Sequence, residues 1–280
     1  MTADATTSDV DAARNDAFFA GVQAYRRAQL SAAILVTRAA AVRDQEAHLD
    51  VTGQRIRAGK APRYLLARDR AALAVVKRMR EDAAAERDEA VDDLSVVLAF
   101  DQSTPPQIAT PLEVASIHGT LDQFVRRALA QAPTILGAQL REQAARSTVA
   151  GARGAYSPTA TLSGDGGTRS ANDDKARATL LGAQVVLEKA RASTERDVRN
   201  AWRELQAAQQ NLMTAQAGAD DAAEQLRIAH VCEAAGKGIE LEVLDALSVA
   251  ATARETAVKA VARFDTAIAS LHHAAGDLTL

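Results

Sequence analysis

The side chains best suited to acid–base, nucleophilic or metal chemistry are scattered along this chain. Its five histidines stand at positions 48, 118, 230, 272 and 273, and no two of them lie four residues apart with a carboxylate between. Cys232 is the single cysteine, which excludes an intramolecular disulfide and a multi-thiolate metal site. No serine or cysteine lies in a glycine-framed turn typical of a nucleophile. We therefore predict no catalytic residue, no metal site and no cofactor, and expect that the protein is not an enzyme.

Two glycine-rich segments resemble phosphate-binding loops but lack essential positions. In the segment 164–167, a dinucleotide-binding pattern would need glycine where Arg169 stands. In the segment 235–238, Val231 replaces the first glycine of a phosphate-binding loop, and Gly238 replaces the hydroxyl that binds magnesium. Both segments are interpreted as turns.

The amino-acid composition limits the classes of protein to which this chain can belong. There are 33 basic and 36 acidic residues, a net charge of −3, with both signs interspersed, so no basic surface for nucleic acid is expected. Hydrophobic residues make up 48% of the chain but aromatic residues only 3%. The apolar content is dominated by alanine, which favours closely packed helices over a thick core. No apolar run approaches the ~20 residues of a membrane-spanning helix.

The pattern of prolines and glycines predicts long helices separated by a few breaks. We expect one helix up to Arg57, a break at 58–62, and a second helix to about Ala99. Helix resumes after Thr120, an expected N-cap, and is interrupted at Ala132-Pro133. From about Ala176 a heptad repeat of apolar residues indicates an antiparallel coiled-coil partner. Only residues 159–163 alternate like a strand.

An internal repeat accounts for both helix pairs. Ala-Gly-Lys occurs at 58–60 and at 235–237, an offset of 177 residues. The same offset aligns many other residues without a gap, including the pairs Tyr25/Trp202, Arg26/Arg203, Leu35/Leu212, Asp44/Asp221, Asp88/Asp265 and Leu94/Leu271. Matches on both sides of the break indicate that one helical hairpin has been duplicated.

The duplicated hairpins, together with the segments 120–133, 155–164 and 235–246, resemble the TolC-like outer-membrane efflux protein family. The resemblance runs from about residue 24 to residue 278. It implies an all-α protomer of long antiparallel coiled-coil hairpins. In the family, three protomers form a hollow periplasmic barrel joined to an outer-membrane β-barrel. This chain offers at most a vestigial β segment, so it resembles a shortened member that lacks most of those strands.

The resemblance also implies a set of functional positions. Gly59, Lys60, Gly236 and Lys237 match the hairpin tips that contact a periplasmic adaptor protein. Glu242 and Asp245 match acidic residues that form a ring at the pore constriction, where negative charge favours cations. From the residues alone, both acids also suit a solvated helix start, where the helix dipole stabilises negative charge.

Together, the sequence patterns and the resemblance predict how the chain is organised and what it does. The predicted parts are a first hairpin (9–100), a linker (101–119), a helix leading into the second repeat (120–153), a vestigial strand and loop (154–175) and a second hairpin (176–278). By resemblance, a homotrimer forms a periplasmic duct in a tripartite efflux or secretion system, with an adaptor and an inner-membrane pump as partners. The alternative is a soluble helical scaffold that binds protein partners without transport. No signal peptide is evident, so the expected location is the periplasm and outer membrane by resemblance, or the cytoplasm if the start is genuine.

Overall fold

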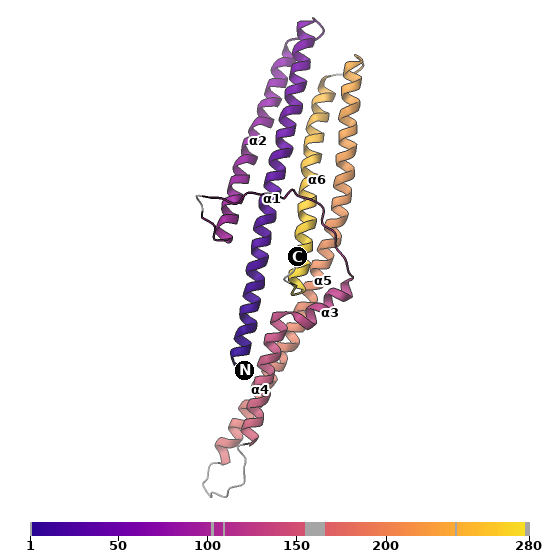
Figure 1. Ribbon diagram of the computed structural model, residues 1–280. Helices are drawn as coiled ribbons and strands as arrows, with labels where there is room; N and C mark the ends of the chain where they lie inside the picture. The colour runs from indigo at the N-terminus through magenta and orange to yellow at the C-terminus, as the bar shows by residue number, and fades with distance from the viewer. Residues whose placement is uncertain (1, 102–103, 109, 155–165, 239, 278–280) are drawn as a thin grey trace. The chain divides into compact units, whose positions relative to one another are not determined.

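The fold is built from long helices, as predicted. The computed structural model describes residues 2–101, 104–108, 110–154, 166–238 and 240–277 (Figure 1). The helices are α1 (Thr2–Arg57), α2 (Tyr64–Val97), α3 (Leu121–Gln131), α4 (Pro133–Gly154), α5 (Gly166–Ala234) and α6 (Glu240–Ala274). These described ranges contain no strand, and the strand-like residues 159–163 lie outside them. The predicted all-α fold class is confirmed.

None of the described helices is both long and apolar enough to cross a membrane.

The helix ends reproduce the internal repeat. The offset of 177 residues carries the last residue of α1, Arg57, onto the last residue of α5, Ala234. It also carries the end of α2, Val97, onto the end of α6, Ala274. The duplicated hairpin inferred from sequence matches is therefore present as two helix pairs, α1/α2 and α5/α6, whose helices end at matched positions (Figure 1).

The chain forms two compact units, and the helices of each hairpin in unit 2 are held together by a small apolar cluster. The chain divides into unit 1 (Met1–Phe19, Ile117–Glu204 and Ile268–Leu280) and unit 2 (Ala20–Ser116 and Leu205–Ala267). In unit 2, one cluster of buried side chains joins α5 to α6, and its members are Ala222, Leu226, Val243, Ala246, Leu247 and Ala250. A second joins α1 to α2 through Ala28, Ala90 and Leu94. Small alanines at these contacts let the helix backbones approach closely.

Ion pairs connect the two hairpins within unit 2. Three arginines on α1 or α6 bind carboxylates of the other helix, in the pairs Arg26–Asp265 (3.2 Å), Arg38–Glu255 (3.1 Å) and Arg254–Asp44 (2.8 Å). Arg55 of α1 likewise pairs with Glu233 of α5. Charge-assisted contacts along α1 therefore connect the first hairpin to the second.

Unit 1 is organised by the short helix α3 and its aromatic residue. Thr120 forms the predicted N-cap, with a capping box in which its backbone amide donates to Gln123 Oε1 at 2.9 Å. Pro133 begins α4 directly after α3 ends, so the predicted interruption is present. Phe124 is buried, and its ring lies 5.9 Å from that of Trp202 and 5.6 Å from that of His272. The side chain of Trp202, which lies in the second repeat, therefore takes part in helix packing.

The helix α5 starts at Gly166, earlier than the expected residue 176. Within these additional turns, Arg177 pairs with Asp173 at 2.6 Å, an i,i+4 contact that stabilises an exposed helix.

Candidate functional site at the hairpin tips

The two hairpin tips have the same backbone conformation. Gly59 has a φ of +71° and Gly236 a φ of +68°, both in the left-handed region that favours glycine. A Cβ atom at either position would meet no neighbour within 4 Å. Glycine is thus required at each tip by the backbone dihedral angle and not by crowding.

The hydrogen bonds at the tips match as well. The amide of Lys60 donates to the carbonyl of Arg55 at 2.8 Å, and the amide of Lys237 donates to the carbonyl of Cys232 at 2.9 Å. Each is the 6→1 bond of a Schellman motif, which ends a helix on a left-handed glycine. The side chains of both lysines are exposed. The four tip residues of the sequence prediction therefore form two equivalent, solvent-facing turns.

The two predicted constriction acids lie on one exposed face of α6. Glu242 is in the first turn of the helix, and Asp245 follows it by three residues, so the two carboxylates are neighbours on the helix surface. Both residues are exposed, while Val243 and Ala246 of the same turns are buried in the hairpin core. This arrangement fits the helix dipole, which stabilises negative charge near the start of the helix.

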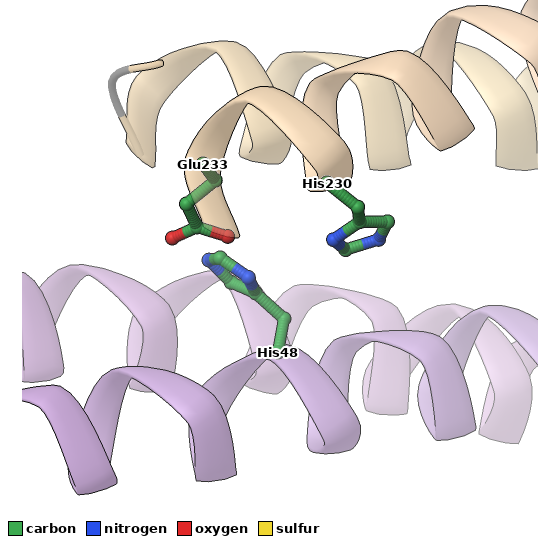
Figure 2. A group of neighbouring side chains, drawn as sticks. All are labelled: His48, His230 and Glu233. Atoms are coloured by element: carbon green, nitrogen blue, oxygen red, sulfur yellow. The ribbon is translucent and has the colours of Figure 1, made fainter. Parts of the chain in front are cut away.

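The interior beneath the tips holds a group of ionisable side chains that sequence reasoning missed. His48 of α1, Asp69 of α2 and Glu240 of α6 are all buried, and each offers a ligand atom within 4.8 Å of the others. His48 Nε2 lies 3.8 Å from Asp69 Oδ2. Figure 2 shows that His230 and Glu233 of α5 reach the same histidine from the second hairpin.

Burial changes the protonation of this group. Desolvation raises the pKa of Glu240 to about 7, and the negative charge of Asp69 adds to the effect, while Arg55 opposes it. Burial also lowers the pKa of His48, with the charge of Asp69 acting in the opposite direction. The histidine is therefore held in its neutral form, in which a ring nitrogen can act as a ligand or an acceptor.

The spacing of these residues explains why they were missed. His48, Asp69 and Glu240 are far apart in the sequence, and only the fold brings α1, α2 and α6 together. The internal repeat gives no signal either, because the offset of 177 residues places Gln225, Ala246 and Arg63 at the corresponding positions. His48 shares its face of α1 with two further polar residues, Gln45 and Thr52, and all three are buried.

A surface pocket leads to this group. It has a volume of about 360 Å³, and its lining includes His48, His230, Val51, Leu226 and Arg254. His230 is exposed there, whereas His48 is buried. The residues that line the pocket come from α1, α5 and α6, and His48 is the member of the buried group that borders it.

Comparison with solved structures places the fold among bacterial outer-membrane channels. The chain matches a structure of CusC with a TM-score of 0.80, 18% identity and coverage of 98% of this chain and 71% of CusC. For the open state of MtrE from Neisseria gonorrhoeae these values are 0.77, 19%, 98% and 68%. For VceC from Vibrio cholerae they are 0.72, 15%, 98% and 74%. At this identity the likeness establishes the fold.

The sequence itself carries a family signature over the second repeat. Residues 164–277 match the model of the family described as outer membrane efflux protein. No curated protein matches the chain at the level of sequence. The matched range contains the second tip and the two acids predicted for the constriction, Glu242 and Asp245. The resemblance to the TolC-like outer-membrane efflux family, predicted from the repeat and its motifs, is confirmed over residues 164–277 by this match.

Proposed function

We propose that this protein is an outer-membrane-factor-like component of a tripartite efflux or secretion system. As a homotrimer it forms a periplasmic helical duct for the export of small molecules, and its tips contact a periplasmic adaptor that joins it to an inner-membrane pump. Its site of action is the periplasm and outer membrane, and it works by assembly and passage, without catalysis. The observation that carries the proposal is the family match over residues 164–277, which includes the second hairpin and its tip.

Exposed apolar side chains support self-association. On α5, Leu181 and Val185 are one turn apart and 64% and 60% exposed. On α2, Val75 and Met79 are likewise one turn apart and exposed. Large apolar side chains paired in this way on a helix surface are typical of contact faces, and a second copy of the chain is the partner that the duct requires.

The assembly state gives the first test. We expect purified protein to have about three times the mass of the 29.5 kDa chain by sedimentation analysis. The double variant Leu181→Glu, Val185→Glu places charge on the exposed apolar face, so it should shift the species toward monomer while retaining its helical circular dichroism. A protein that stays monomeric at every concentration contradicts the duct.

Export gives the second test. Deletion of the gene in its native host should increase susceptibility to a panel of antimicrobial compounds, and the wild-type gene should restore resistance. Gly59→Pro together with Gly236→Pro disrupts both tips, because proline cannot adopt a positive φ, and this variant should fail to restore resistance. Unchanged susceptibility combined with a monomeric protein would favour the alternative, a helical scaffold that binds partners without transport.

A further inference from the structure

The buried group beneath the tips lacks hydrogen-bond partners. Both ring nitrogens of His48 and all four carboxylate oxygens of Asp69 and Glu240 are buried, and no residue outside this group of three hydrogen-bonds to them in the described part of the chain. Buried polar groups in folded proteins are normally satisfied, and an unpaired carboxylate is costly to desolvate. Three such residues aimed at one another indicate that a further component completes the site.

The same face of α1 carries more unsatisfied polar atoms. Gln45 lies three residues before His48, and Thr52 lies four residues after it, so all three side chains share one face of the helix. The Gln45 Nε2 and Thr52 Oγ1 atoms are buried and also have no partner. This stretch of α1 is therefore polar within the interior, where a helix normally places apolar residues.

We propose that His48, Asp69 and Glu240 bind a divalent transition-metal ion of the zinc class. One imidazole nitrogen and two carboxylate oxygens within 4.8 Å of one another are a ligand set for Zn²⁺ and its neighbours. Mg²⁺ and Ca²⁺ select sites made of oxygen atoms, and the absence of a thiolate in this ligand set disfavours Cu⁺. This inference does not depend on the proposed transport function.

The neighbouring histidine and glutamate take a secondary part. Glu233 can join His48 and His230 in a second ligand set, but its carboxylate already accepts a hydrogen bond from Arg55. His230 is exposed and lines the surface pocket together with His48. It therefore lies where an ion from solvent first reaches the group, and the buried set of three residues is the binding site.

The ligands join three helices close to both turns. Asp69 lies near the start of α2, and Glu240 is the first residue of α6. His48 lies within about three turns of the end of α1. A metal ion bound here links the first hairpin to the second beneath their tips. Metal binding consequently restricts movement of the tip of one hairpin against the other.

The test uses the purified full-length chain after treatment with a chelator. Isothermal titration with ZnCl₂ should give one ion per chain, and zinc should raise the unfolding temperature in a way that EDTA reverses. Co²⁺ should bind with a visible absorption band, which reports direct coordination, and Mg²⁺ at the same concentration should produce no stabilisation. The variants His48→Gln, Asp69→Asn and Glu240→Gln should each weaken zinc binding by at least about 10-fold.

The controls separate metal binding from folding and from general charge. Asp50→Asn removes an exposed carboxylate two residues from His48 and should leave the zinc affinity unchanged. Asp69→Asn and Glu240→Gln keep the side-chain shape, so their apo forms should unfold no earlier than the apo wild type. Zinc should slow amide hydrogen exchange in the first turns of α6 in the wild type and not in Glu240→Gln.

Two results would overturn the proposal. The first is that wild-type protein gives no zinc titration and no zinc-dependent change in unfolding temperature. The second is that zinc binds with equal affinity to the wild type and to all three ligand variants, which would place the ion elsewhere on the chain.

Discussion

Arg38 of α1 forms a bidentate ion pair with Glu255 of α6 through two nitrogens of its guanidinium group. Its Nε donates to Oε2 at 3.1 Å and its Nη2 donates to Oε1 at 3.2 Å. The remaining nitrogen, Nη1, donates to the backbone carbonyl of Met79 on α2 at 3.0 Å. One side chain therefore connects both helices of the first hairpin to the second, with the planar, bidentate geometry that makes arginine–carboxylate pairs strong.

This pair predicts a pH-dependent contribution to stability. The hydrogen bonds from Arg38 hold the pKa of Glu255 below its ordinary value of 4.5, so the folded state binds fewer protons at this residue than the unfolded state does. The resulting stability is present above pH 4.5 and is lost as the pH falls through the lowered pKa. Glu255→Gln should lower the free energy of unfolding by about 1–2 kcal/mol at pH 7. Urea denaturation at pH 7 and pH 3.5 should show this difference shrinking at the lower pH, and a constant difference would contradict the account.

Any side chain in place of a tip glycine is expected to lower the free energy of unfolding. Gly59→Ala should lower the free energy of unfolding by about 1 kcal/mol, because alanine is strained at a φ of +71°. The same change at Gly236 should have a similar effect, since its φ is +68°. Thermal or urea unfolding of each variant provides the measurement.

A matched control exists on the same helix. Gly53 lies inside α1, and a Cβ atom there would meet nothing within 4 Å. Gly53→Ala should therefore raise the free energy of unfolding by about 0.5–1 kcal/mol, because alanine has the higher helix propensity. If Gly59→Ala were as stabilising as Gly53→Ala, the left-handed backbone conformation of Gly59 would be contradicted.

The end of α2 predicts a stabilising substitution. Ala99 has a φ of +52°, and the repeat offset aligns it with Gly276, whose φ is +72°. Two hydrogen bonds, from Ala99 to Val96 and from Phe100 to Ser95, close the same type of C-terminal motif. Ala99→Gly should raise the free energy of unfolding by about 0.5–1 kcal/mol by removing the strain. A decrease in a calorimetric unfolding experiment would argue against this backbone conformation.

The aromatic contact in unit 1 predicts a large loss of stability. Phe124 is 2% exposed and packs against Trp202 and His272. Phe124→Ala should cost about 3–5 kcal/mol, because it leaves a cavity in a small core. Phe18→Ala, at an exposed position of α1, should change the free energy of unfolding by less than about 0.5 kcal/mol. Equal effects of the two variants on the free energy of unfolding in urea would contradict the burial of Phe124 in the core.

The exposed acids on α6 predict a change in ion selectivity. Under the proposed function, the double variant Glu242→Gln, Asp245→Asn removes negative charge from the constriction, so the cation-over-anion permeability ratio in planar bilayers should fall several-fold. Stability should change by less than about 0.5 kcal/mol, because both side chains are exposed. Asp220→Asn, an exposed change on α5, serves as the control. A ratio equal to that of the control would exclude a ring at this position.

Local patterns were sufficient to predict the helices and the turns at the hairpin tips, but not the start of α5 at Gly166. The glycines at 59 and 236 and the cap at Thr120 depend on nearby residues alone, and the structure confirms the tip turns and the capping box. The repeat offset also relates the C-terminal ends of α1 and α2 to those of α5 and α6. These features are visible in the sequence because helix termination is decided within a few residues.

The buried group could not be predicted in this way. His48, Asp69 and Glu240 meet only because the first hairpin packs on the second within unit 2, a tertiary contact with no signature in local spacing. They do not form a ligand pair one helical turn apart, because each comes from a different helix. The family resemblance implies roles for the tips and for the α6 acids, which stay predictions, and it implies none for the interior beneath the tips.

Fractionation of the native host tests the central claim most directly. The protein, expressed from its own promoter, would be followed by antibody into cytosol, periplasm, inner membrane and outer membrane. The account predicts recovery in the outer-membrane fraction as a species that chemical cross-linking converts to a trimer. Recovery only from the cytosol would contradict a role in export.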